Sequence, residues 1–197
     1  MRRIGVFGGT FDPPHVGHLA LAEWAREALS LDRVIFVPAA RPPHKRGKRM
    51  SAAEDRVAMT RLAVRGNRAF AVSTIEVRRT GPSYTVDTLR ALARAHPRAQ
   101  LWLLMGEDSL REFHTWHAPE RILALARLAV AGRPGARAPR SVGRAARGRV
   151  VALRNPGLQI ASSAIRARVR AGRSVRYLVP DAVARYAAAH RLYARSR

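Results

Sequence analysis

Cysteine is absent from this chain of 197 residues, so neither disulfide bonds nor thiolate metal ligands can hold the fold together. Long apolar runs are missing as well: nowhere do about 18 uncharged apolar residues follow one another, so we expect no transmembrane helix. The first residues lead directly into an apolar strand and glycines, without the apolar stretch and small-residue cleavage site of a signal peptide. These absences predict a cytoplasmic protein that does not bind a membrane.

Acidic residues are scarce, with 13 Asp and Glu against 37 Lys and Arg, which gives a formal net charge of +24. A positive field of this size attracts phosphate groups of any kind, nucleic acid included. The basic residues are almost all Arg, however, and they are spread along the chain beside many Ala, which is typical of a compositional bias. We therefore expect no dedicated nucleic-acid partner, and keep a basic nucleic-acid-binding protein as a rival function class.

Apolar residues make up 47% of the chain, enough for one sizeable core in a single domain that spans residues 1–197. Short apolar runs alternate with helical patterns along this domain. A repeated strand-then-helix pattern predicts an α/β fold: a single Rossmann-like, doubly wound parallel sheet with helices on both faces. The predicted strands are residues 4–7, 34–37, 70–77, 101–105, 128–131 and 150–153.

Helices are predicted between these strands from apolar spacing and from start and stop signals. Apolar residues recur at helical spacing from residue 21 to residue 29, and the last helix covers residues 181–190. The serines at positions 51, 83 and either 162 or 163 are predicted to cap the helices that follow them. Residues 133–149 consist almost wholly of Arg, Gly, Pro, Ala and Ser, which predicts a mobile surface segment.

Three polar clusters follow predicted strands: residues 8–18, residues 106–108 and residues 160–166. In open α/β sheets, ligands bind beyond the carboxyl ends of the strands. We therefore expect these three clusters to converge on one crevice.

The first cluster combines a glycine turn with two histidines three residues apart. It reads Gly8-Gly9-Thr10-Phe11-Asp12-Pro13-Pro14-His15-Val16-Gly17-His18. If a helix begins near Val16, both imidazoles lie at its positive end, where backbone N–H groups favour anions. A bound phosphate would favour the charged, donating form of either ring. Three other interpretations stay open: a metal site, which needs a third ligand, an ordinary tight turn, and structural histidines.

This cluster resembles the phosphate-binding signature of the adenylyl- and cytidylyltransferase superfamily. Its partner there is a late Ser-Ser-x-x-Arg motif, which residues 160–166, Ile160-Ala161-Ser162-Ser163-Ala164-Ile165-Arg166, resemble. Serines at a helix start expose backbone N–H groups, and an arginine one turn later offers a fork for phosphate oxygens. The chain departs from the family at Ala161 and Ala164, where Ile and Thr are common, so one hydroxyl of the family motif is missing here.

The middle of the chain resembles one branch of the superfamily, nicotinate mononucleotide adenylyltransferase. The resemblance lies in Pro42-Pro43-His44-Lys45, Pro82-Ser83-Tyr84-Thr85, Thr88-Leu89, Gly106-Glu107-Asp108-Ser109-Leu110, Trp116 and Gly132-Arg133-Pro134-Gly135. It implies transfer of the adenylyl group of ATP to nicotinate mononucleotide, giving nicotinate adenine dinucleotide and pyrophosphate in NAD biosynthesis. Another transferase of the superfamily, acting on phosphopantetheine or an alcohol phosphate, is the nearest rival.

The resemblance also implies a role for each matching residue. The catalytic residues would be His15, His18 and Arg166. The ATP-binding residues would be Gly8, Gly9, Thr10, Phe11, His15, His18, Gly106, Asp108, Ile160, Ser162, Ser163 and Arg166. The mononucleotide-binding residues would be His44, Lys45, Ser83, Tyr84, Thr85, Trp116, His117 and Arg133. Mg²⁺ would arrive with ATP, with no metal site of the protein's own. Asp12 is interpreted as a turn residue without a catalytic role.

Overall fold

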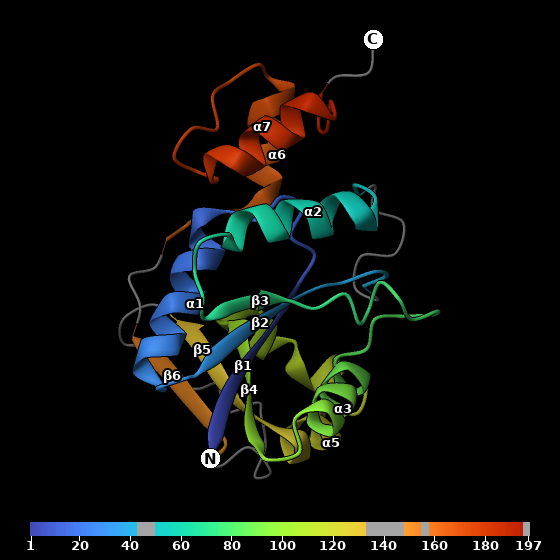
Figure 1. The fold of residues 1–197 in the computed structure, drawn as a ribbon, viewed down its shortest axis with the longest axis vertical. Helices are drawn as coiled ribbons and strands as arrows, with labels where there is room; N and C mark the ends of the chain where they lie inside the picture. Colours follow the sequence, from blue (N-terminus) through green and yellow to red (C-terminus); the bar gives the residue numbers. More distant parts are fainter. Residues whose placement is uncertain (43–49, 133–147, 155–157, 195–197) are drawn as a thin grey trace.

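The computed structural model describes residues 1–42, 50–132, 148–154 and 158–194. Six parallel strands in these ranges form one sheet in the order β3-β2-β1-β4-β5-β6, which is the Rossmann order (Figure 1). The strands are β1 (Arg2–Gly9), β2 (Arg33–Pro38), β3 (Phe70–Val72), β4 (Ala99–Gly106), β5 (Ala126–Gly132) and β6 (Val150–Arg154). The predicted α/β fold with a parallel sheet is confirmed.

Helices cover both faces of this sheet, as predicted (Figure 1). On one face lies α1, and on the other lie α3, α4 and α5; α2 lies over the β2–β3 side, and α6 and α7 pack against it. The helices are α1 (Val16–Ala28), α2 (Ala53–Val64), α3 (Thr85–Ala95), α4 (Glu107–Arg111), α5 (Pro119–Leu125), α6 (Ser162–Arg170) and α7 (Asp181–Ala189), with a short 3-10 helix η2 (Phe113–Thr115).

Strand β4 shows why the sheet needs helices on both sides. Residues 101–105 are all buried. Leu103 packs into the core shared with α3 and α5, whereas its neighbours Trp102 and Leu104 pack into the core shared with α1. Successive side chains of a strand point to opposite faces, so a continuous apolar run is stable only when both faces are covered.

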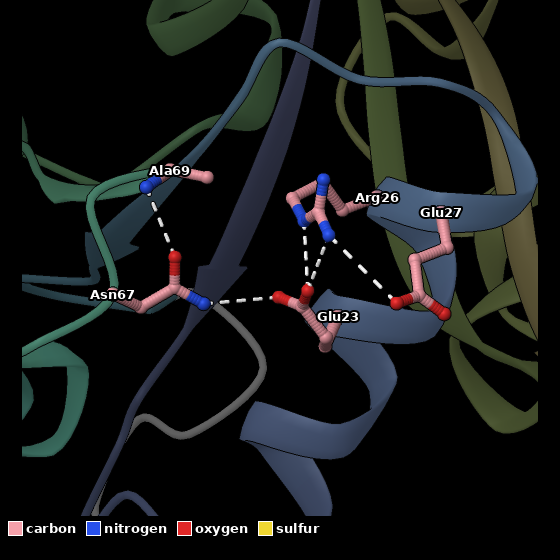
Figure 2. Close-up of polar contacts among 5 residues, drawn as sticks. All are labelled: Glu23, Arg26, Glu27, Asn67 and Ala69. Carbon is pink, nitrogen blue, oxygen red and sulfur yellow. Dashed lines mark hydrogen bonds and ion pairs between the residues drawn. The ribbon is translucent and has the colours of Figure 1, made fainter.

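Helix α1 is tied to the β3 edge of the sheet by a short polar network (Figure 2). Glu23 of α1 accepts a hydrogen bond from Asn67 Nδ2 at 3.0 Å and two from Arg26, at 2.8 and 2.6 Å. Asn67 Oδ1 in turn accepts from the backbone N–H of Ala69 at 2.9 Å. The hydrogen bond from Arg26 lowers the pKa of Glu23, which favours the charged carboxylate that accepts from Asn67.

Several local predictions differ from the structure. The strand predicted over residues 70–77 ends at Val72, and a turn follows it. The predicted serine caps are wrong: the N-caps of α2, α3 and α6 are Ala52, Tyr84 and Ala161, without a side-chain cap bond. Of the surface segment predicted over residues 133–149, residues 133–147 lie outside the described ranges. No helix among the described residues is long and apolar enough to cross a membrane.

Candidate active site

A cleft of about 1360 Å³ opens at the carboxyl ends of β1, β4 and β5. This volume exceeds the roughly 300–1,000 Å³ of a site for one small molecule, so two nucleotide-sized ligands can fit. The cleft lies where the strand order reverses between β1 and β4, the point at which open α/β sheets bind ligands. The predicted site residues that line it are Gly8, Gly9, Thr10, His15, His18, Ser83, Tyr84, Thr85, Gly106, Asp108, Trp116, His117 and Ile160.

The two histidines form a stacked pair at the start of α1. Their ring centroids are 3.6 Å apart with an interplanar angle of 24°. The backbone N–H of His15 donates to Nδ1 of His18 at 3.2 Å, so a neutral His18 ring carries its proton on Nε2. The ring of Phe11 lies edge-on to His18, with centroids 5.1 Å apart. The helix start therefore presents His18 as a donor in a fixed orientation.

His15 is the more buried ring, with 5% of its surface exposed. Its Nδ1 atom has no hydrogen-bond partner in the part of the chain that the structure describes. Burial lowers the pKa of His15 from its usual 6.5 to about 4, so the ring is neutral at pH 7. A bound phosphate favours the cationic form of an imidazole beside it, but two stacked imidazoles repel one another when both are charged. Such a phosphate can therefore favour the cationic form of one ring of the pair.

Stability should consequently depend on pH through His15. The folded-state pKa lies below the unfolded value, so the unfolded chain takes up a proton that the folded protein does not. We expect the free energy of unfolding to decrease as the pH falls from about 6.5 to about 4, and to decrease less steeply in a His15→Gln variant. Urea unfolding of both proteins at about pH 7, 5.5 and 4.5 measures the difference. Parallel curves would contradict the burial assigned to this ring.

Two glycines of the motif lie where side chains approach the backbone closely. A Cβ atom on Gly9 would come within 2.9 Å of the Phe11 ring, and one on Gly17 would come within 3.1 Å of His15 Nδ1. Strand β1 continues through both Gly8 and Gly9 instead of ending in the predicted glycine turn. The glycines therefore make room for rings behind the loop as well as for a ligand in front of it.

The late serine–arginine segment meets the first cluster, as predicted. Arg166 Nη1 donates to the carbonyl oxygen of Asp12 at 2.7 Å, and Ser162 Oγ donates to the carbonyl oxygen of Pro13 at 2.9 Å. Of this segment, Ile160 lines the cleft, whereas Ser162, Ser163 and Arg166 are not among the residues that line it. The contacts that Ser162, Ser163 and Arg166 would make with phosphates stay predictions.

Aromatic side chains form the opposite end of the cleft. Tyr84 at the N-terminus of α3 packs against His117, with ring centroids 4.3 Å apart. Trp116 follows η2 and packs against the buried Phe113 at 5.6 Å. The positive end of α3 favours an anionic group beside these rings. This combination suits a flat ring that carries a carboxylate.

The chain is similar to known proteins over nearly its whole length. The cytidylyltransferase-like family model matches residues 6–168. The protein called "Probable nicotinate-nucleotide adenylyltransferase" in Thermomicrobium roseum is 51% identical over 202 aligned residues, which cover 98% of this chain and 92% of that protein. The protein of the same name in Herpetosiphon aurantiacus is 45% identical, and the alignment covers 98% of this chain and 99% of that protein. The chain belongs to the nicotinate-nucleotide adenylyltransferase family.

Solved structures of proteins called nicotinic acid mononucleotide adenylyltransferase share the fold. The Plasmodium falciparum nicotinic acid mononucleotide adenylyltransferase complexed with NaAD superposes with a TM-score of 0.82 at 16% identity, and each chain is covered to 98%. The same enzyme complexed with APC gives a TM-score of 0.80. At this identity the likeness supports the Rossmann-like architecture and no residue role.

Some site residues expected of this family are placed differently. Phe11 is 1% exposed and packs in the core behind the loop, so any contact with ATP would come from its backbone. The Asp108 side chain is almost fully exposed at the cleft rim, 3.8 Å from Arg111. His44, Lys45 and Arg133 lie outside the described residues.

Ser83 lines the cleft, but its hydroxyl is already occupied. Its Oγ accepts hydrogen bonds from the backbone N–H groups of Ala40 and Arg41, at 3.0 and 3.1 Å. The Ser83 hydroxyl itself donates a hydrogen bond to Glu76, a buried carboxyl that also accepts one from Thr88 Oγ1 at 2.6 Å. A hydroxyl has one donor and two acceptor sites, and in this structure Ser83 uses them within the protein, so its contact with a substrate carboxylate stays a prediction. Its side chain fixes the wall that carries Tyr84.

Sequence reasoning missed three residues around this family's motif. Arg56 of α2 is 1% exposed and holds backbone carbonyl groups at the base of the cleft, Glu76 organises the wall near Ser83, and Tyr193 contacts Asp12. None of them belongs to a motif with a fixed spacing. The one sequence signal was the pairing of an acid and hydroxyl residues in the stretch 76–88.

Proposed function

We infer that the protein transfers the adenylyl group of ATP to nicotinate mononucleotide, forming nicotinate adenine dinucleotide and releasing pyrophosphate. One observation carries this inference: a single cleft joins the histidine pair at the start of α1 to the aromatic wall of Tyr84, Trp116 and His117. The first end suits a triphosphate and the second suits a pyridine ring with its carboxylate. The relatives at 51% and 45% identity carry the corresponding name over nearly their whole length.

The reaction needs alignment and charge stabilisation, and no covalent enzyme intermediate. A phosphate oxygen of the mononucleotide forms a bond to the α-phosphorus, the bond from that phosphorus to the β-phosphate bridging oxygen breaks, and pyrophosphate leaves with the electron pair. His18 is the proposed donor to the α-phosphate, because its orientation is set by the bond from the His15 backbone. A fixed donor stabilises the charge that builds up in the transition state more than the ground state.

The serine–arginine segment would complete the triphosphate site from behind the loop. A guanidinium has five N–H donors, so the bond from Arg166 to Asp12 uses one of them and others can serve phosphate oxygens. Ser162 has one hydroxyl donor, which is used in the hydrogen bond to the Pro13 carbonyl. Its contribution to phosphate binding would therefore be the backbone N–H at the start of α6.

We propose that Mg²⁺ enters the cleft with ATP. The helix N-terminus at the first end of the cleft favours phosphate oxygens over a cation, and no group of three or more His, Asp or Glu side chains among the described residues could hold a metal ion. Magnesium in nucleotide sites is held mainly by phosphate oxygens and water. When bound, the ion would neutralise charge on the phosphates and on the leaving pyrophosphate. The described carboxylates that line the cleft are Glu76, Glu107 and Asp108.

A substrate panel tests the proposed function. ATP is supplied with nicotinate mononucleotide, its amide analogue, phosphopantetheine or an alcohol phosphate, and pyrophosphate and the dinucleotide are quantified. Nicotinate adenine dinucleotide should be the main product. Product formation with phosphopantetheine alone would assign the chain to another branch, and RNA binding without any pyrophosphate release would replace the enzyme by a binding protein.

Trp116→Ala should weaken use of the pyridine nucleotide. Stacking of a flat ring on an aromatic side chain contributes about 1–3 kcal/mol, so the KM for nicotinate mononucleotide should rise about 5–150-fold. The KM for ATP should change less than about twofold, because the triphosphate lies at the other end of the cleft. Steady-state kinetics with each substrate varied in turn measures both values. A loss confined to ATP would move Trp116 to the other subsite.

A further inference from the structure

The short loop between β1 and α1, residues 10–14, carries the chain into His15. It receives side chains from parts of the chain that are distant in sequence. Arg56 Nη1 donates to the carbonyl of Thr10, Arg166 to that of Asp12, and Ser162 to that of Pro13. Three of the five positions of the loop are thus held by side chains from outside it.

The Asp12 carboxylate is the centre of this arrangement. Asp12 is 2% exposed. Its Oδ1 accepts from the Tyr193 hydroxyl at 2.6 Å, and its Oδ2 accepts from the backbone N–H of Ser51 at 3.3 Å. One buried residue therefore joins the loop to the start of α2 and to the end of the described chain.

Tyr193 is built to act as a donor at this place. It follows α7 in the left-handed region of backbone space, with φ of 65°, and its side chain packs against the cluster that contains Met59 of α2. Burial, together with the hydrogen bond to Asp12, raises the pKa of Tyr193 above its usual range, so the phenol stays protonated. A buried carboxylate that accepts from a permanent O–H donor is held in a single orientation.

The same C-terminal layer, residues 162–194, also reaches helix α1 itself. The backbone N–H of Val16, the first residue of α1, donates to the carbonyl of Leu178 at 3.0 Å. The loop before α1 and the helix start that carries both imidazoles are therefore held from one layer, through Tyr193 and Leu178.

We propose that Tyr193 and Asp12 are positioning residues of the reaction, acting through the loop on His15 and His18. Neither touches the reacting atoms. Their hydrogen bond fixes where the loop delivers His15, whose backbone N–H fixes the His18 ring. This inference rests on the proposed function, in which a misplacement of about 1 Å costs on the order of 10²-fold in rate.

The test compares two tyrosines of the same layer. Tyr193→Phe removes the hydroxyl that contacts Asp12. Tyr186→Phe is the matched control, since Tyr186 donates to Asp55 at 2.9 Å and ties α7 to α2 without touching the loop. Assayed well below both melting temperatures, Tyr193→Phe should lower kcat about 10–100-fold with the KM for nicotinate mononucleotide little changed. Tyr186→Phe should keep the wild-type kcat. Equal losses in both variants, or wild-type kcat in Tyr193→Phe, would overturn the proposal.

A second readout does not depend on activity. In the native arrangement Nδ1 of His18 accepts a hydrogen bond, so ring ¹⁵N spectra should show the Nε2–H tautomer. Tyr193→Phe should shift these signals toward a mixture of tautomers, and Tyr186→Phe should not. Unchanged His18 signals in Tyr193→Phe would contradict the positioning role even if the proposed reaction failed. A wild-type protein with these spectra and no dinucleotide product would contradict the function alone.

Discussion

A His18→Ala variant is expected to have a kcat about 10²–10⁴-fold below that of the wild type, while its affinity for ATP falls much less. In the ground state the triphosphate would have several donors, so removing one imidazole weakens binding little. In the transition state the charge on the α-phosphate is greater, and a donor held by the His15 backbone is already aligned with it. The loss should therefore appear in kcat.

Two variants sharpen this experiment. His18→Asn keeps an acceptor for the His15 N–H but lacks the Nε2 donor, so it should lose turnover nearly as severely as alanine. His114→Ala removes an exposed imidazole that is not among the described residues lining the cleft, and it should keep wild-type kinetics. Single-turnover measurement of dinucleotide formation, with ATP affinity measured separately, distinguishes chemistry from binding. Near-normal turnover in His18→Ala would remove this residue from the mechanism.

The sheet could be predicted because its signals are local. A run such as residues 101–105 is apolar at every position, which only a strand buried on both faces satisfies. Strand and helix alternation then fixes the class of fold, and the rule for ligand sites places the three polar clusters at one edge. The cleft confirms that placement for residues of all three clusters, because Gly9, Asp108 and Ile160 all line it.

The serines show where such reasoning ends. A serine before a helix is predicted to cap it, because the local backbone is always within reach of its hydroxyl. In the structure Ser83 receives N–H groups from residues 40 and 41, and Ser162 donates to Pro13, 149 positions away. The sequence states what a hydroxyl can bind, but the partner is decided by which segments the fold brings together.

Arg56 and Tyr193 were missed for the same reason. An arginine beside Glu54 and Asp55 at the start of a helix is typical of a solvated, charged first turn, and a tyrosine after the last helix has no pattern at all. Only the structure reveals that Arg56 is buried, that Tyr193 is partly buried, and that both side chains contact the loop. Their contacts join segments of which just one carries a recognisable motif.

Arg56→Met should cause the largest loss of stability of any substitution considered for this protein. The guanidinium is 1% exposed and donates to the carbonyl groups of Thr10, Ala39, Ala40 and Ser51, at 2.9, 2.5, 3.3 and 3.0 Å. Methionine fills a similar volume but leaves those buried acceptors without donors. Removing a charged donor from a buried network costs about 3–5 kcal/mol, a large part of the 5–15 kcal/mol that holds a typical domain folded.

Urea unfolding measures this loss, with Arg61→Met on the same helix as the control. Arg61 is exposed, so its replacement should change the free energy of unfolding by less than about 0.5 kcal/mol. If Arg56→Met does not fold, Arg56→Lys remains measurable, and should fall between the two because an ammonium has three donors for four carbonyl groups. The same bonds join the Thr10 end of the loop to Ala39 and Ala40, and Ala40 is also held by Ser83, so Arg56→Lys should lose turnover as well as stability. Wild-type stability in Arg56→Met would show that the carbonyl groups find other donors, and that this arginine does not join the two ends of the cleft.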